Sequence, residues 1–160
     1  MATNTHTFTS ESVERTQALA ACLAKCVQPG AVIALVGDLG AGKTHFTQGF
    51  AQGLGVASAV TSPTFTVMVA YEGGRLPLYH FDLYRLEDAA ELEDVAFYDY
   101  VESNGVSCIE WASKFADELP DSTLWLSITT GADDTRTIEA TANDAQAAEL
   151  LAAWVDAVAQ

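Results

Sequence analysis

The sequence predicts an α/β fold with a mixed sheet, in which helices flank a parallel core and antiparallel hairpin strands extend it. Two patterns support this prediction. In the first half of the chain, apolar runs typical of buried strands alternate with helical patterns, which favours parallel strands. Later segments pair across short turns, which favours antiparallel hairpins. A length of 160 residues and a hydrophobic content of 49% predict one domain over residues 1–160.

The first half of the chain contains a helix, a strand, a second helix and a hairpin. Helical spacing of apolar residues, a wholly apolar run, and a Glu-Gly-Gly turn between two apolar stretches indicate these elements in that order. The expected elements are a helix capped by Thr9 or Ser10 and ended by Pro29-Gly30, a strand over 31–36, a helix over 44–54, and strands over 65–71 and 76–83.

The second half is read in the same way. An acidic stretch with helical character precedes a short apolar strand, and two alternating stretches flank a Gly-Ala-Asp-Asp turn. An Ala-rich amphipathic pattern ends the chain. The expected elements are one or two short helices over 87–100, a strand over 106–111, a helix over 112–119, strands over 123–130 and 135–140, and a helix over 145–158 capped by Asn143.

The strongest local signal is Gly37-Asp38-Leu39-Gly40-Ala41-Gly42-Lys43-Thr44, which fits the P-loop pattern G-x-x-x-x-G-K-[ST]. Its glycines allow successive backbone N–H groups to converge on one anion, and the following helix adds the positive end of its dipole. We therefore expect the fold to be that of a P-loop NTPase, in which this loop binds the phosphates of a nucleotide. Lys43 should reach the β- and γ-phosphates, and the hydroxyl of Thr44 should hold Mg²⁺.

Two carboxylates are candidates for the second Mg²⁺ acid, because in P-loop enzymes this acid ends a buried strand. Glu110 ends the strand predicted over 106–111, and Asp82 follows an apolar stretch in the strand over 76–83. Either could bind the metal, and the other could orient the attacking water. Thr64, on a loop after the P-loop helix, is placed like the switch threonines that sense a γ-phosphate. His45 and His80 have no partner in the sequence and are assigned to the scaffold.

Composition restricts the function further. The chain has 22 Asp and Glu against 7 Lys and Arg, a formal net charge of −15, which argues against binding nucleic acid alone. The acidity fits a basic protein partner, a salty cytoplasm or simply a soluble acidic domain. The polar N-terminus lacks the pattern of a signal peptide, and no apolar run is long enough to span a membrane, so a cytoplasmic location is expected.

Three further features bear on chemistry. Cys22, Cys26 and Cys108 are expected to be small core residues, since no His or Cys stands at zinc-site spacing from them. An Asn-Lys-x-Asp motif that reads guanine is missing, which argues against a GTPase. An Arg-rich lid, which small-molecule kinases use to hold a second phosphate substrate, is missing too. A P-loop phosphotransferase and an ATP-dependent assembly scaffold remain as alternatives to an ATPase.

Four segments in this order resemble the TsaE (YjeE) family over about residues 10–140: the P-loop, Ser62-Pro63-Thr64-Phe65, His80-Phe81-Asp82-Leu83-Tyr84-Arg85-Leu86, and Ile109-Glu110-Trp111. The resemblance implies a bacterial P-loop ATPase that is needed to make N6-threonylcarbamoyladenosine (t6A) in tRNA. It also implies two partners, TsaB and TsaD, which form a heterodimer in which TsaD carries out the threonylcarbamoyl transfer. Hydrolysis of ATP would reset that complex between turnovers, slowly when the ATPase is alone.

The resemblance also assigns roles to individual residues. It implies that Thr44 and Glu110 bind Mg²⁺, and that Thr64 and Asp82 act near the γ-phosphate, with Asp82 positioning water. Trp111 would lie beside the site. The start of the first helix and a late segment around Arg136 would lie near the base. The chain departs from many members at His45, where they carry Thr, and at Gln48, where they carry a basic residue.

Overall fold

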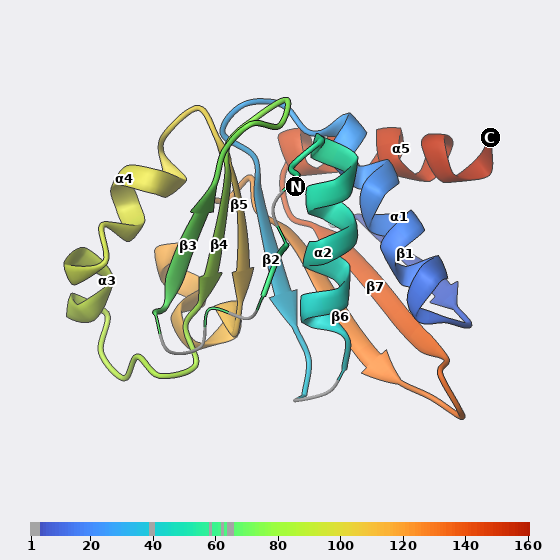
Figure 1. The fold of residues 1–160 in the computed structure, drawn as a ribbon, viewed down its shortest axis with the longest axis horizontal. Helices are drawn as coiled ribbons and strands as arrows, with labels where there is room; N and C mark the ends of the chain where they lie inside the picture. Colours follow the sequence, from blue (N-terminus) through green and yellow to red (C-terminus); the bar gives the residue numbers. More distant parts are fainter. Residues whose placement is uncertain (1–3, 39–40, 58, 62, 64–65) are drawn as a thin grey trace.

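In the computed structural model, which describes residues 4–38, 41–57, 59–61, 63 and 66–160, one seven-stranded sheet forms the centre of the molecule (Figure 1). The elements are β1 (Asn4–Ser10), α1 (Val13–Cys26), β2 (Val32–Val36), α2 (Lys43–Leu54), β3 (Met68–Tyr71), β4 (Leu78–Asp82), α3 (Ala90–Asp94), α4 (Phe97–Val101), β5 (Val106–Glu110), the 3-10 helix η1 (Ala112–Glu118), β6 (Leu124–Thr130), β7 (Arg136–Ala142) and α5 (Ala145–Ala159).

The strand order is β1-β7-β6-β2-β5-β4-β3. Strands β6, β2, β5 and β4 run parallel, whereas β3 pairs antiparallel with β4, and β7 pairs antiparallel with β6 and β1. The predicted mixed sheet with a parallel core is therefore confirmed. Because the P-loop strand β2 is central and parallel to its neighbours, the carboxyl ends of β2, β4, β5 and β6 all meet at one edge of the sheet.

Helices cover both faces of the sheet (Figure 1). Helices α1, α2 and α5 pack on one face, and α3, α4 and η1 pack on the other, each set over its own cluster of buried apolar residues. Alternate residues of β2 point to the two clusters: Ile33 and Leu35 to the first, and Val32 and Ala34 to the second. A strand that is buried on both faces reads as an apolar run, which is why the sequence showed it clearly.

Helix α2 lies unusually close to α1. A Cβ atom at Gly49 would lie 2.3 Å from the backbone oxygen of Gln17, and one at Gly53 would lie 2.6 Å from that of Ala21. The two glycines thus provide the space in which the helices touch through their backbones. This contact fixes the position of α2, whose first residue is Lys43 of the P-loop.

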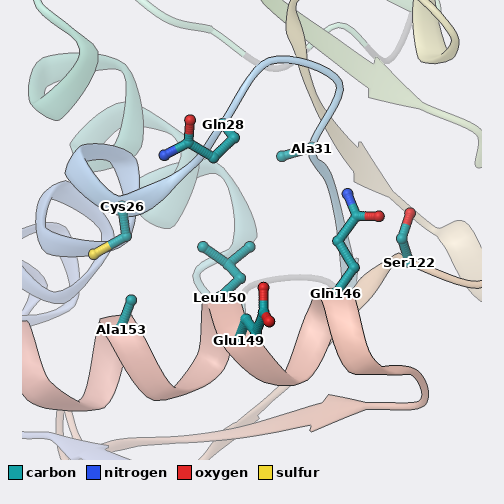
Figure 2. A pocket seen from close by; sticks show the side chains of 8 residues that line it. All are labelled: Cys26, Gln28, Ala31, Ser122, Gln146, Glu149, Leu150 and Ala153. Atoms are coloured by element: carbon teal, nitrogen blue, oxygen red, sulfur yellow. The ribbon is translucent and has the colours of Figure 1, made fainter.

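A hollow of about 240 Å³ lies between the end of α1 and the first turns of α5, and its lining includes Cys26, Glu149 and Leu150 (Figure 2). Ala31 and Ser122, which precede β2 and β6, also line it. The hollow therefore lies at the amino ends of the parallel strands, away from the P-loop, and no predicted site residue lines it.

Two predicted helix caps are wrong, and the strand β1 was not predicted. Thr9 and Ser10, the expected caps of α1, belong to β1, and the side chain that caps α1 is Ser12, which accepts from the N–H of Arg15. Helix α5 is capped by Asp144 rather than Asn143. The expectation for the cysteines is met in part: Cys108 lies in the core and Cys22 packs against it, but Cys22 and Cys26 are only half-buried on α1. Polar capping residues lie so close together in these segments that spacing alone does not choose between them.

The remaining boundaries differ slightly from the expectation. The acidic stretch forms two short helices, α3 and α4, which Ala96 separates in a left-handed conformation (φ 57°). The hairpin strands begin at Met68 and Leu78, and Phe65, where the first was expected to begin, lies outside the described residues. Within the described ranges, the structure contains no helix long and apolar enough to cross a membrane.

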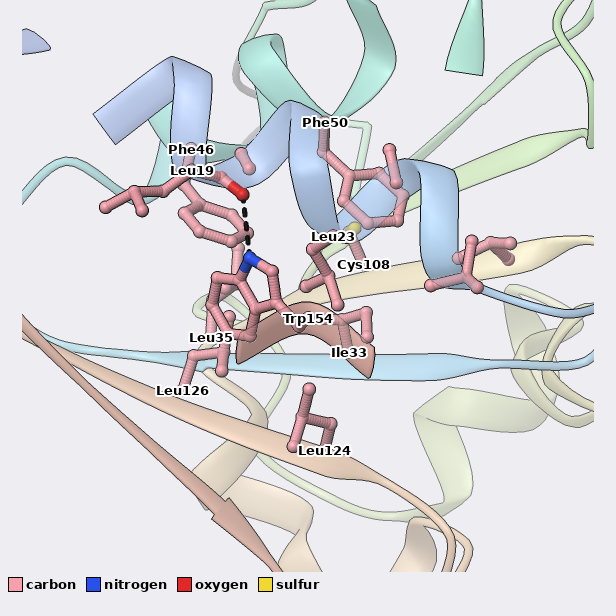
Figure 3. Close-up of a cluster of buried hydrophobic side chains, with 14 of the residues drawn as sticks. Leu19, Leu23, Ile33, Leu35, Phe46, Phe50, Cys108, Leu124, Leu126 and Trp154 are labelled. Carbon is pink, nitrogen blue, oxygen red and sulfur yellow. Dashed lines mark hydrogen bonds between the residues drawn. The ribbon is translucent and has the colours of Figure 1, made fainter. Parts of the chain in front are cut away.

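Trp154 of α5 joins three other elements in the core (Figure 3). Its indole is fully buried, and Nε1–H donates to the carbonyl oxygen of Leu19 on α1 at 2.9 Å. Its ring lies 4.3 Å from Phe8 of β1 and 6.2 Å from Phe46 of α2, measured between centroids. The last helix therefore holds β1 and both helices of the P-loop face together.

Replacing Trp154 with Ala should lower the free energy of unfolding by about 3–5 kcal/mol, because it leaves a cavity and removes a buried hydrogen bond. Urea unfolding followed by circular dichroism measures the change. Asp156→Ala, at an exposed position two residues away on the same helix, is the control and should shift stability by less than about 0.5 kcal/mol. Equal midpoints for the two variants would contradict this role of α5.

Candidate functional site

The loop between β2 and α2 begins and ends at positions that require glycine. A Cβ atom on Gly37 would lie 2.5 Å from the carbonyl oxygen of Ile128 on β6, so the chain can leave the sheet here only without a side chain. Gly42 has a φ of 106°, a conformation that L-residues with a side chain rarely adopt. Between them, Leu39 and Gly40 lie outside the described residues. The backbone carbonyl oxygen of Asp38 accepts from the N–H of Ala41 at 3.0 Å.

Gly42 also starts α2 without a side-chain cap. The first turn of this helix contains no acidic residue, so no carboxylate side chain within that turn neutralises its positive end. Uncapped N–H groups at the start of a helix are donors that an anion can accept. The local structure thus matches what phosphate binding requires.

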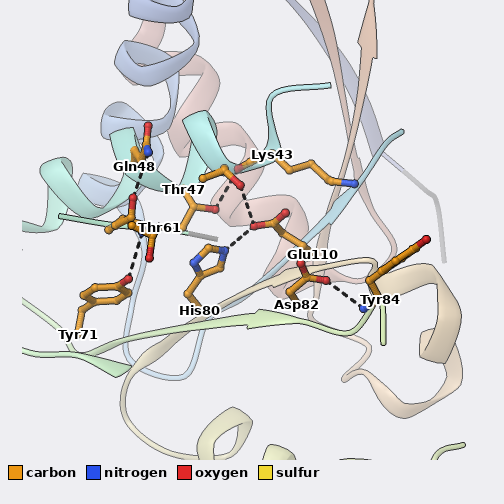
Figure 4. A network of polar contacts seen from close by, with 11 residues as sticks. Lys43, Thr47, Gln48, Thr61, Tyr71, His80, Asp82, Tyr84 and Glu110 are labelled. Carbon is orange, nitrogen blue, oxygen red and sulfur yellow. Dashed lines mark hydrogen bonds and ion pairs between the residues drawn. The ribbon is translucent and has the colours of Figure 1, made fainter. Parts of the chain in front are cut away.

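Lys43, the first residue of α2, is 5% exposed, and its ammonium is held inside the site (Figure 4). Nζ donates to the carbonyl oxygen of Gly37 and lies 3.9 Å from the centroid of the Trp111 ring. Burial lowers the pKa of Lys43, while Glu110, Asp82 and Asp38 act in the opposite direction by favouring the charged form. The ammonium therefore has little water around it, and the charges of nearby carboxylates act on it without a direct ion pair among the described residues.

The two predicted acids lie side by side. In the parallel pairing of β4 with β5, Asp82 is the register partner of Glu110, and Glu110 in turn pairs with Leu35 of β2. Both carboxylate residues are 3% exposed. The hydroxyl of Thr44 lies 3.5 Å from Oε2 of Glu110, the limit of a hydrogen bond. The structure thus brings Lys43, Thr44, Asp82 and Glu110 together, as the sequence predicted.

Asp82 is tied to the segments on either side of it. Its Oδ1 accepts from the N–H of Tyr84 at 3.0 Å, and its own N–H donates to the carbonyl oxygen of Val67 at 2.8 Å. Val67 has a φ of 69°, which is costly for a β-branched residue, and it ends the loop that contains the Ser-Pro-Thr-Phe segment. Thr64 itself lies outside the described residues, so its predicted role stays a prediction.

Trp111 and Arg136 also reach the site. Trp111 follows β5 in a left-handed conformation (φ 59°), and its ring lies 4.9 Å from that of Tyr84. Nε of Arg136, on β7, donates to the carbonyl oxygen of Ala41 at 3.0 Å. Arg136 thus connects β7 to the backbone of the P-loop.

A small hollow beside Gly42 is lined by the start of α1 and by the late segment around Arg136. Its lining residues include Val13, Thr16 and His45. The resemblance implied that the first helix and this late segment lie together near the base of the nucleotide. The structure places both next to the P-loop, and His45, which departs from many family members, is exposed beside them.

Gln48, the other departure from the family pattern, makes internal contacts. Its Oε1 accepts from Nε2 of Gln17 on α1 at 3.2 Å, and its Nε2 donates to the carbonyl oxygen of Val60 at 3.1 Å. The side chain thus connects α1, α2 and the start of the loop that leads to β3. The loop is held again by Tyr71, whose hydroxyl accepts from the N–H of Thr61 at 3.4 Å.

His80 is the site residue that sequence reasoning missed. It was assigned to the scaffold, yet its Nε2 lies 2.6 Å from Oε2 of Glu110 and its side chain is fully buried (Figure 4). One signal could have revealed it: His80 stands two residues before Asp82, so the two side chains share a face of β4. The partner strand could not be known from that spacing.

Comparisons with known proteins agree with the geometry. Residues 10–138 match the family model described as threonylcarbamoyl adenosine biosynthesis protein TsaE. The chain is 48% identical to the tRNA threonylcarbamoyladenosine biosynthesis protein TsaE of Bacillus subtilis (strain 168) over 129 residues, which cover 81% of this chain and 80% of that protein. It is 40% identical to the protein of the same name from Treponema pallidum (strain Nichols), over 81% of this chain and 95% of that one.

The fold has a counterpart among solved structures. The crystal structure of YdiB from Bacillus subtilis superposes with a TM-score of 0.84 at 35% sequence identity, and the alignment covers 98% of this chain and 97% of that one. The family model, in contrast, begins at the last residue of β1 and ends within β7. These matches confirm the family that the motifs indicated: the chain belongs to the TsaE family of tRNA threonylcarbamoyladenosine biosynthesis proteins.

Proposed function

We propose that this chain binds ATP with Mg²⁺ at the carboxyl edge of its parallel strands and hydrolyses it, as the ATPase subunit of a tRNA-modifying complex with TsaB–TsaD. The observation that carries the proposal is the position of Lys43. Buried Lys43 begins an uncapped helix directly after Gly42, and the carboxylates that end β4 and β5 favour the charged form of its ammonium. This combination of groups is the one that P-loop NTPases use to bind and cleave a phosphate chain.

The residues present fit Mg²⁺ as well as nucleotide. The site contains two carboxylates, Glu110 and Asp82, and one ammonium, that of Lys43. Without a metal ion, the carboxylates would therefore repel a triphosphate. Among the described residues, no group of three or more His, Cys, Asp and Glu side chains is placed to hold a metal ion. The ion would therefore take the hydroxyl of Thr44 and the carboxylate of Glu110 and would share phosphate oxygens, as Mg²⁺ usually does.

The chain's own residues would divide the work. The backbone N–H groups after Gly37 and the Lys43 ammonium would bind the phosphates, and the bound ion would offset charge that develops during hydrolysis. Asp82, whose orientation is fixed by the N–H of Tyr84, would orient the attacking water. Thr64 would sense the γ-phosphate, while Trp111 and Arg136 would bound the nucleotide site.

Replacing Lys43 with Ala should weaken ATP binding by about 10- to 100-fold, because a charged hydrogen bond to phosphate contributes about 1.5–3 kcal/mol. Isothermal titration calorimetry measures the affinity. Lys25→Ala removes the same charge from an exposed position on α1 and should leave it unchanged. Near-normal ATP binding by the Lys43 variant, with its fold intact by circular dichroism, would refute the P-loop assignment.

Replacing Asp82 with Ala should leave ATP binding within a few-fold of normal but slow hydrolysis by about 100-fold or more, because the water loses its orienting base. Single-turnover release of phosphate measures the hydrolysis step. Asp94→Ala, at an exposed position on α3, serves as the charge control. If the Asp82 variant instead fails to bind Mg²⁺–ATP, Asp82 is a metal ligand and Glu110 becomes the candidate that positions water.

The partner is proposed from the family and from charge. The relatives are named for t6A biosynthesis, and this chain has a formal net charge of −15, which suits a protein partner better than direct contact with tRNA phosphates. The chain would therefore supply energy from ATP to a complex in which other subunits contact the tRNA. Hydrolysis that is slow alone and faster in the complex would avoid wasting ATP.

Adding purified TsaB–TsaD should raise the rate of ATP hydrolysis several-fold above that of the chain alone. Phosphate release with and without the pair is the measurement, and Asp82→Ala in the same mixture shows whether the added hydrolysis comes from this site. Fast turnover without partners, on an added small metabolite, would indicate a phosphotransferase instead. Full t6A formation with both Asp82→Ala and Glu110→Ala would indicate an assembly scaffold that needs ATP only for binding.

A further inference from the structure

His80 is a buried polar residue to which the proposed mechanism gives no task. It stands on β4, is 0% exposed, and contacts a carboxylate that is also buried. In register it pairs with Cys108 of β5, two residues before the pair formed by Asp82 and Glu110. Its side chain therefore reaches diagonally along the sheet to Glu110, a distance that a long side chain spans.

The contact determines where the proton of the ring lies. An ionised carboxylate, the form that binds a metal ion, only accepts hydrogen bonds, so with Glu110 in that form the Nε2 of His80, 2.6 Å from Oε2, is the donor. The other ring nitrogen, Nδ1, is buried and has no hydrogen-bond partner among the described residues. A buried ring nitrogen without a partner destabilises the fold. The position of His80 is therefore explained by its contact with Glu110 and not by packing alone.

The oxygen that His80 contacts also lies near the P-loop. Oε2 of Glu110 lies 2.6 Å from Nε2 of His80 and 3.5 Å from the hydroxyl of Thr44 (Figure 4). Without the ring, a flexible glutamate side chain would have several rotamers open to it. With the ring, the carboxylate is held next to Thr44, on the side where α2 begins.

We propose that His80 is a positioning residue for magnesium binding: by donating Nε2–H to Oε2, it holds the Glu110 carboxylate beside the Thr44 hydroxyl. The inference rests on the proposed function, since it assigns these two residues to Mg²⁺. Residues that orient metal ligands by hydrogen bonds are a general feature of metal sites, and their loss usually lowers metal affinity 10- to 100-fold. His80 contacts the ligand and not the ion.

Two variants separate positioning from simple packing. In His80→Gln, the side-chain amide can still donate from a similar distance along the chain. In His80→Leu, the volume stays but the donor is lost. The control is Leu78→Ala. Leu78 is fully buried on the same face of β4 but at the amino end of the strand, opposite the end that carries Asp82, so its replacement reports a general loss of core stability.

The measurement is the affinity of each protein for ADP, by calorimetry, with Mg²⁺ and again with excess EDTA. We expect His80→Leu to weaken binding by about 10- to 100-fold with Mg²⁺ but to leave binding in EDTA unchanged. His80→Gln should restore most of the loss, and Leu78→Ala should show the wild-type ratio between the two conditions. Equal weakening in both conditions, or a failure of Gln to restore binding, would overturn the positioning role.

A second measurement needs no variant. Long-range ¹H–¹⁵N spectra of the wild-type protein without nucleotide should show a proton on Nε2 of His80, and a ring without that proton would overturn the inference. The proposed function fails in a different way: wild-type protein whose ADP affinity does not depend on Mg²⁺ would refute the magnesium site itself, and the role of His80 with it. If the wild type and His80→Leu both show the normal Mg²⁺ dependence, only the positioning role of His80 is refuted, and the magnesium site stands.

Discussion

The parallel pairing of β2, β5 and β4 is the constraint on which the site depends. Parallel strands place their carboxyl ends at one edge, and the register sets Glu110 opposite Asp82 and beside Leu35. The chain leaves β2 at that same edge to form the P-loop. A shift of the register by one residue would turn both carboxylates to the opposite face of the sheet. The catalytic geometry proposed for this protein is thus a consequence of strand pairing.

The price of this arrangement is electrostatic. The site buries an ammonium, two carboxylates and an imidazole in one region, and burial lowers the pKa of Lys43. Each of these groups loses water on folding, and the losses are only partly offset by contacts within the site. A bound nucleotide with its metal ion would supply further partners. This charge balance supports the proposal of a ligand that carries both negative charge and a divalent cation.

The first strand and the last helix, which lie almost wholly outside the family model, pack around the elements that it covers. Strand β1 extends the sheet beyond β7, and α5 closes over α1 through Trp154. Arg136, on the strand β7 that pairs with β1, donates to the carbonyl oxygen of Ala41 within the P-loop. The side chain of Arg136 thereby connects β7, next to the edge strand β1, to the phosphate-binding loop. The solved structure of YdiB aligns over nearly the whole chain, so the overall fold is shared with that protein.

The sequence by itself determined the P-loop, the strands that end in Asp82 and Glu110, and the mixed α/β sheet, because each is a local pattern of a few consecutive residues. Only the tertiary structure decided that His80 contacts Glu110 across 30 residues of chain and that Arg136 supports Ala41 across 95. It also decided that the residues before α1 form a strand. Hydrophobic periodicity reports which face of an element is buried, but strand order and register choose its neighbours, and these depend on the packing of the whole chain.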